Sequence, residues 1–143
     1  MILLFFTCQP ISKNSVKAAV VSARSEASDI GVEIMARGGN AFDAMIATGL
    51  ALSVCYPNAG NIAGGGFLVY KTVDGEYGSL DYREKSPLLS SKDMYLDSTG
   101  NVIPEKSTLG GLAVGVPGTV AGLYEVYEKF GSLPWEDFVQ PSI

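Results

Sequence analysis

The side chains best able to do chemistry stand together in the segment Asp81-Tyr82-Arg83-Glu84. If this segment ends a strand, Asp81 and Arg83 share one face, because successive side chains of a strand point to opposite sides. A guanidinium binds a carboxylate through two parallel hydrogen bonds, so Arg83 is a candidate anchor for an amino-acid substrate. The alternative is an ordinary surface ion pair between Arg83 and Asp81, which is the commoner arrangement. The carboxylates of Asp81 and Glu84 alone do not assign acid and base roles.

The residue inventory narrows the possible chemistry. The sequence has no histidine, which excludes a Ser-His-Asp triad, a Cys-His dyad and histidine ligands to zinc. Neither a G-x-S-x-G nor an S-x-x-K motif occurs, so a serine nucleophile has no local support. Cys8 and Cys55 form no C-x-x-C pair, and Cys55 lies in an apolar run typical of a small buried side chain. We therefore expect no metal and no cofactor.

Composition and charge predict a folded domain that does not bind nucleic acid. The chain has 143 residues, within the range of about 100–200 expected of one domain. It is 47% hydrophobic and 17% charged, which supports a packed core and excludes global disorder. Lys and Arg number 10 against 15 Asp and Glu, and a net charge of −5 has the wrong sign for neutralising phosphates.

Two glycine-rich segments accompany the charged segment. Gly64-Gly65-Gly66 lies between a predicted helix and a predicted strand, the reverse of the order in a phosphate-binding loop. Its backbone should therefore pass close to another chain segment or to a ligand. The stretch GVPGTVAG at 115–122 precedes a helix and permits an anion site at the helix N-terminus. A tight turn with close packing at Gly122 is the simpler interpretation.

The elements that must position these residues follow from periodicity and end signals. Asn40 and Asp43 have the spacing of a capping box, and Pro57 ends the nearly uniformly apolar helix that follows, which should be buried centrally. An earlier helix should have Ser25 as its N-cap and close at Gly38-Gly39. The first half of the chain is thus predicted to contain a short buried strand at 18–22, a helix from 25 to about 37, and a helix at 42–56.

The second half should begin with a hairpin. The dipeptide Asp74-Gly75 is a strong turn signal between two strand-like runs, and residues 84–110 are polar and turn-rich, as in a surface excursion. Apolar spacing then predicts a helix whose buried face carries Val120, Leu123, Tyr124 and Tyr127. The expected elements are strands at 67–72 and 77–82, a helical turn at 92–96, a helix at 119–130 and another opened by Pro134-Trp135.

The amino terminus has the character of an export signal. Residues 1–8 are an apolar run that ends in Cys8 and is followed by polar residues, an order similar to that of a bacterial lipoprotein signal. This interpretation predicts a periplasmic or exported protein, lipid-anchored at Cys8. Residues 1–15 would then be a signal remnant and linker, and 16–143 the folded part. The alternative is a disordered or edge-strand terminus.

Four motifs, taken together, resemble the amino-terminal part of the γ-glutamyltranspeptidases, also called glutathione hydrolases. They stand in the family's order and cover nearly everything after residue 16. The resemblance implies an α+β fold, the N-terminal portion of an αββα sandwich of the N-terminal-nucleophile hydrolase type, incomplete in this chain. The motifs are GGNAFDA at 38–44, NAGNIAGGGF at 58–67, DYREKSP at 81–87 and GVPGTVAG at 115–122.

The resemblance also implies a reaction. Members of the family are proenzymes that cleave themselves into a large and a small subunit, and the new N-terminal threonine of the small subunit is the nucleophile, with its own α-amine as base. They transfer the γ-glutamyl group of glutathione or related amides to water, an amino acid or a peptide through an acyl-enzyme. Arg83 matches the family arginine that pairs with the substrate α-carboxylate.

The same resemblance implies that this chain is a fragment of the large subunit. It would supply the carboxylate-binding wall and lack the nucleophile, so that it is inactive without the small subunit or the missing C-terminal half. The alternative is a degenerate, non-enzymatic chain or half-sandwich that acts only by association with a complementary subunit. The sequence leaves hydrolysis, transpeptidation and acylase chemistry on other amides open.

Overall fold

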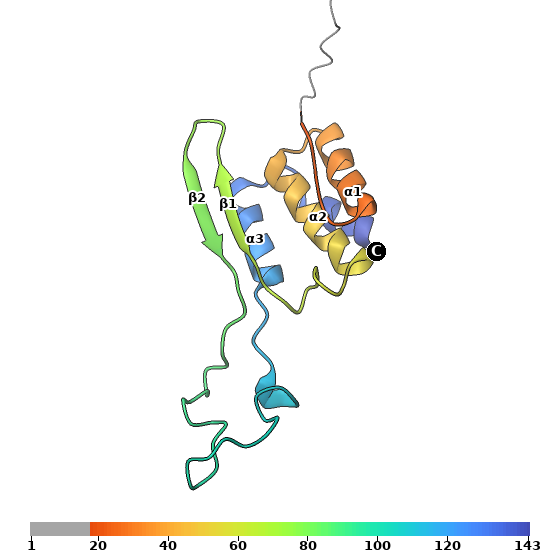
Figure 1. Cartoon of the computed structure of the whole chain (residues 1–143). Coiled ribbons are helices and arrows are strands. Elements are labelled where there is room, and N and C mark those ends of the chain that lie inside the picture. The colour runs from red at the N-terminus through yellow and green to blue at the C-terminus, as the bar shows by residue number, and fades with distance from the viewer. Residues whose placement is uncertain (1–17) are drawn as a thin grey trace, which may run out of the picture.

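Helix α2 (Ala41–Cys55) is the apolar centre of the structure, a computed structural model that describes residues 18–143. Its residues Ala44, Ile46, Ala47 and Ala51 are almost fully buried. Helices α1 (Ser25–Ala36), α3 (Thr119–Phe130) and α4 (Trp135–Val139) all pack against it (Figure 1). The predicted central helix is confirmed. A helix that is apolar on nearly all sides is stable in water only when neighbouring elements cover it.

The start of α2 is fixed by the predicted capping box. The Asn40 side chain accepts hydrogen bonds from the backbone N–H groups of Phe42 (2.7 Å) and Asp43 (3.1 Å), and the Asn40 N–H donates to Asp43 Oδ2 (2.8 Å). Asp43 is completely buried and also accepts from the Ser132 N–H (3.0 Å) and hydroxyl. Ser132 lies between α3 and α4, so the cap of one helix also holds the connection between two others.

Helix α1 begins one residue away from its expected cap. The N-cap is Arg24 in extended conformation, and Ser25, predicted as the cap, is the first helical residue. No side chain caps this end, since the Ser22 hydroxyl instead donates to the Arg24 carbonyl (2.7 Å). The C-terminal prediction is confirmed: Gly38 has a φ of +98°, and Gly39 N–H donates to the Ile34 carbonyl (3.0 Å).

The predicted strand at 18–22 is wrong. These residues form no strand, although Val20 packs against Gly31 of α1. Val21 is 92% exposed, so the apolar run is not buried as a unit. A strand requires a hydrogen-bonded neighbour, and the sheet in residues 18–143 consists of two strands elsewhere in the chain. The predicted signal remnant and the anchor at Cys8 lie outside the described residues.

A β-hairpin beside the helices leads to the segment of interest. Strands β1 (Phe67–Lys71) and β2 (Tyr77–Asp81) are antiparallel, with Phe67 opposite Asp81, and Gly75 turns the chain with a φ of +88°. Side chains alternate: Leu68 and Leu80 pack on the helical core, whereas residues of the other face are exposed. The predicted hairpin is confirmed.

An extended arm leaves the end of the hairpin and returns to α3 (Figure 1). Its base is closed by two backbone hydrogen bonds, from Lys85 N–H to Val116 O (3.1 Å) and from Val116 N–H to Lys85 O (2.8 Å). The predicted surface excursion is confirmed, but the predicted helical turn is not: residues 92–95 form turns, and Leu96 forms a β-bridge with Val102. The arm also contains the short 3-10 helix η1 (Gly111–Ala113).

The buried face of α3 is rotated from the predicted one. Of the predicted residues, Leu123 is buried and Tyr127 packs against the core, whereas Val120 and Tyr124 are 46% and 44% exposed. Gly122 and Val126 are buried in their place. The rotation places Gly122, which has no side chain, toward the hairpin. Helix α4 starts at the predicted Pro134-Trp135 and buries Phe138 completely before the chain passes into η2 (Gln140–Ser142). No helix among residues 18–143 has the length and apolarity needed to cross a bilayer.

The role of Asp43 predicts a large effect of its removal. Asp43→Ala removes a completely buried carboxylate and its hydrogen bonds from Asn40 and Ser132, so we expect the free energy of unfolding to fall by about 2 kcal/mol. Asp43→Asn keeps one acceptor oxygen and should lose less. Urea denaturation measures the change, with Asp93→Ala as the exposed control, expected within about 0.5 kcal/mol of the original protein. An Asp43→Ala protein as stable as the control would contradict this role.

Candidate functional site

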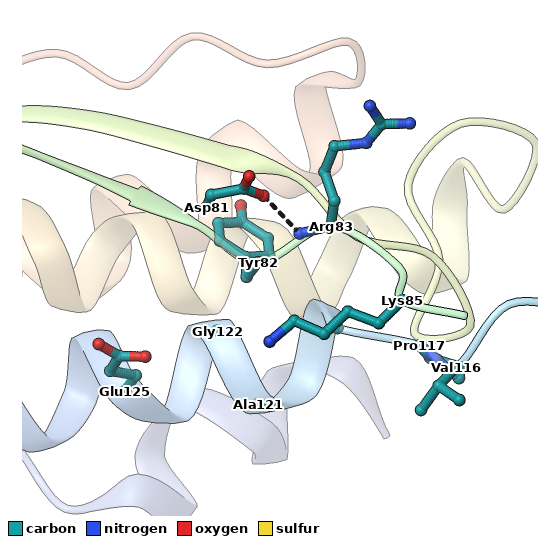
Figure 2. Close-up of a pocket in the computed structure, with 10 residues that line it drawn as sticks. Asp81, Tyr82, Arg83, Lys85, Val116, Pro117, Ala121, Gly122 and Glu125 are labelled. Atoms are coloured by element: carbon teal, nitrogen blue, oxygen red, sulfur yellow. Dashed lines mark hydrogen bonds between the residues drawn. The ribbon is translucent and has the colours of Figure 1, made fainter. Parts of the chain in front are cut away.

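The segment Tyr82-Arg83-Glu84 continues the edge of the hairpin and is fixed on both sides. The Tyr82 N–H donates to the Gly66 carbonyl (3.0 Å), so the strand pairing extends one residue beyond β2. Asp81 Oδ1 accepts the backbone N–H of Arg83 (3.0 Å), the interaction dashed in Figure 2. At the far end, the bridge between Lys85 and Val116 closes the segment. Its backbone is therefore held from both neighbouring stretches of chain.

The triple glycine lies directly against this segment. A Cβ atom on Gly65 would be 2.6 Å from the Tyr82 carbonyl oxygen and 2.7 Å from Arg83 Cα, closer than real contacts allow. The prediction of a close backbone approach is confirmed, and the neighbour is another chain segment. Gly64 O accepts the N–H groups of Gly118 (2.8 Å) and Thr119 (3.0 Å). These donors at the start of α3 are thus satisfied by backbone, which leaves them unavailable to an anion.

The Tyr82 ring lies between the hairpin and α3. A Cβ atom on Gly122 would overlap the ring at Cγ, and one on Gly66 would lie 2.8 Å from Cε2. The predicted close packing at Gly122 is confirmed, with Tyr82 as its partner. Burial raises the pKa of the Tyr82 phenol above the ordinary value of 10.0, because the apolar surroundings disfavour the phenolate.

Arg83 points the opposite way. Its guanidinium extends away from α3, toward the exposed face of the hairpin, in Figure 2, and its Cζ lies 5.7 Å from the centroid of the Phe67 ring. The ion pair with Asp81 that the sequence left open is absent from residues 18–143, where Arg83 forms no salt bridge. Asp81 and Arg83 are both exposed, as the predicted shared face requires. The guanidinium is thus free to bind a carboxylate.

A cavity of about 250 Å³ lies between the end of β2 and the start of α3. Arg83 contributes to its lining while its guanidinium leaves it, and Lys85 and Glu125 add charges of both signs (Figure 2). Glu125 also pairs with Lys129 at 2.5 Å. The sequence pattern did not identify Tyr82, Lys85 or Glu125 as site residues. Lys85 stands two residues beyond Arg83 and Glu125 three beyond Gly122, but only the packing of α3 on the hairpin brings them together.

Comparison with known proteins gives the family. The family model described as gamma-glutamyltranspeptidase matches residues 27–143. The glutathione hydrolase proenzyme of Pseudomonas sp. (strain A14) is 52% identical over 124 residues, which are 87% of this chain and 22% of that protein. The glutathione hydrolase proenzyme of Escherichia coli (strain K12) is 43% identical over 123 residues, 86% of this chain and 21% of that protein. The chain therefore belongs to the γ-glutamyltranspeptidase family.

Solved structures confirm the fold class. The γ-glutamyltranspeptidase of Helicobacter pylori superimposes with a TM-score of 0.85 at 47% identity, covering 93% of this chain and 38% of that one. The Bacillus anthracis transpeptidase CapD gives a TM-score of 0.68 at 28% identity, covering 87% of this chain and 36% of that one. The structure is thus an α+β portion of an N-terminal-nucleophile hydrolase fold. The chain spans about a fifth of the length of the curated relatives it matches.

Burial of Tyr82 predicts a titration that can be measured. Its phenol should ionise in the folded protein at a pH above the ordinary value of 10.0. The ultraviolet absorbance of phenolate in the original protein minus that in Tyr82→Phe isolates the titration of Tyr82, and the same difference measured in urea gives the unfolded reference. Because the folded pKa lies above the unfolded one, the associated stability is present below pH 10 and is lost as the pH rises through the folded pKa. Equal titration of Tyr82 in the folded and the urea-unfolded protein would contradict the buried position.

Proposed function

We propose that this chain forms the carboxylate-binding wall of an enzyme that transfers the γ-glutamyl group of glutathione or a related amide to water, an amino acid or a peptide. Arg83 is the residue that binds the substrate α-carboxylate. The observation that carries the proposal is an exposed guanidinium at a strand end that is fixed by backbone hydrogen bonds. Membership of the family supports the γ-glutamyl group as the part of the substrate that is recognised.

The surroundings of Arg83 suit a carboxylate. The acceptor nearest along the chain, Asp81, is engaged by the Arg83 backbone N–H, which leaves the guanidinium donors for a substrate. A guanidinium and a carboxylate match in plane and spacing, so two parallel hydrogen bonds fix both the charge and the orientation of the bound group. The Phe67 ring lies beneath the guanidinium and offers an attractive face to the cation.

The nucleophile belongs, in this proposal, to a part of the protein outside this sequence. In the resemblance to the family, a threonine hydroxyl attacks the γ-carbonyl carbon and forms an ester, while its proton passes through the threonine α-amine to the departing amine. Water or an acceptor amine then breaks the ester. That the chain spans about a fifth of its curated relatives, several of them described as proenzymes, supports a further segment or subunit as partner.

The alternative of a non-enzymatic chain that acts only by association stays open. It differs from the proposal in what the DNA downstream of the coding region should contain. An in-frame continuation, or a neighbouring frame that carries a threonine-initiated small-subunit motif, supports the enzyme. A stop codon followed by unrelated sequence supports the alternative.

Removal of the guanidinium should weaken substrate binding. In the complete protein, Arg83→Ala is expected to lower kcat/KM for a γ-glutamyl anilide about 30-fold or more, mainly through KM, because loss of a bidentate charged contact costs at least about 2 kcal/mol. Arg83→Lys should recover only part of the loss, since an ammonium cannot bind bidentately. Lys71→Ala is the matched control, an exposed cation on the same face at the far end of β1. Unchanged KM in Arg83→Ala would remove the proposed role.

The chain by itself should show no turnover. Incubation of the purified 143-residue chain with a γ-glutamyl anilide is expected to release no chromophore above the rate without protein. The complete protein from the same expression system serves as the positive control. Chromophore release by the isolated chain that persists when an inhibitor of contaminating enzymes is added would contradict a nucleophile located outside this sequence.

A further inference from the structure

We propose that Tyr82 is a positioning residue that sets the direction of the Arg83 side chain. The ring and backbone of Tyr82 are themselves held in a seat formed by Gly66, Gly118 and Gly122. This inference rests on the proposed function, because it assigns Tyr82 a part in carboxylate recognition through Arg83. The Tyr82 ring lies between the hairpin and α3, whereas the Arg83 guanidinium extends away from α3 (Figure 2). The effect of Tyr82 on the substrate is therefore indirect.

The seat accepts the ring and its backbone because its members have no side chains. The ring packs against Gly66 from the loop before β1 and against Gly122 from the first turns of α3. A Cβ atom on Gly118 would overlap the Tyr82 carbonyl oxygen, so the backbone of Tyr82 also depends on this seat. Three separate points thus fix one residue, on its ring and on its main chain.

The orientation of Tyr82 determines that of Arg83. Side chains at successive positions of an extended chain point to opposite faces, so a ring held toward α3 sends the next side chain toward the exposed face. In Figure 2 the Tyr82 ring lies between the hairpin and α3, and the Arg83 guanidinium leaves in the opposite direction.

Arg83 has little else to hold it. Its side chain is exposed and forms no ion pair within residues 18–143, and its contact with Phe67 is a single cation–ring approach at 5.7 Å. The hydrogen bond from the Arg83 N–H to the Asp81 carboxylate fixes the peptide but not the direction of the Arg83 side chain. The direction of the Arg83 side chain is therefore set by the preceding residue. A misplacement of a binding group by about 1 Å can lower the reaction rate as much as 100-fold.

The test compares two substrates in the complete protein. One is a γ-glutamyl anilide, and the other is the 4-aminobutanoyl anilide, which differs only in lacking the α-carboxylate. The ratio of their kcat/KM values measures carboxylate recognition separately from catalysis. Tyr82→Ala should lower this ratio about 10-fold to 100-fold, through KM for the γ-glutamyl substrate. Tyr82→Phe keeps the ring and should keep the ratio.

A second route reaches the same ring without removing it. Gly122→Ala places a methyl group against Tyr82 Cγ and should lower the ratio as well, and this variant stands in if Tyr82→Ala does not fold. In the Tyr82→Ala background the same change should add little, because the clash is gone. Gly49→Ala is the matched control: it is a helical glycine whose Cβ would meet Leu123 at an ordinary 3.5 Å, and the ratio should not change.

The outcomes separate the two proposals. If Arg83→Ala lowers the ratio while Tyr82→Ala and Gly122→Ala leave it intact, the positioning role is wrong and the proposed function stands. If the Tyr82 and Gly122 variants lose activity on both substrates equally, Tyr82 has a structural role only and the inference is likewise overturned. If Arg83→Ala leaves the ratio unchanged, the proposed function itself fails, and the inference fails with it.

Discussion

The buried carboxylate of Asp43 is the interaction on which the arrangement of the helices depends. It accepts hydrogen bonds from Asn40 at the start of α2 and from Ser132 between α3 and α4. A carboxylate is tolerated in an apolar interior only when its oxygens are paired in this way. Because α1, α3 and α4 all pack on α2, the pairing sets where α3 lies. The position of α3 in turn decides what the end of the hairpin can approach.

The site is built where that approach is closest. The segment from Tyr82 to Glu84 lies against the triple glycine on one side and the start of α3 on the other. The Tyr82 N–H donates to the Gly66 carbonyl, and Lys85, the next residue, pairs with Val116 just before α3. Glycine is required here by space rather than by unusual dihedral angles, since Gly65, Gly66 and Gly122 all have ordinary backbone conformations. A binding group at a strand end gains its precision from such rigid support. The exposed side chain of Arg83 is therefore mobile only beyond a fixed base.

Local signals predicted most of the fold, and contacts between distant segments account for the rest. The capping box at Asn40, the hairpin turn at Gly75 and the stop at Gly38 depend on a few adjacent residues, and the structure confirms them. The strand at 18–22 failed because pairing depends on a partner that the local pattern does not specify. Arg83 stood out by residue type and place, but only the packing of α3 on the hairpin brings Tyr82, Lys85 and Glu125 to the same cavity. Sequence spacing between them carries no such signal.

Because hydrogen bonds close the base of the arm, the length of the arm does not affect the geometry of the site. Lys85 and Val116 are joined by two main-chain hydrogen bonds, so everything between them is a loop whose ends are already together. The entropy of closing such a loop rises only by about 0.6 kcal/mol for each doubling of its length. Residues can therefore be inserted into or deleted from the outer part of the arm without a shift of the strand end. The arm is therefore the part of this architecture that can change in length while the strand end that carries Arg83 stays in place.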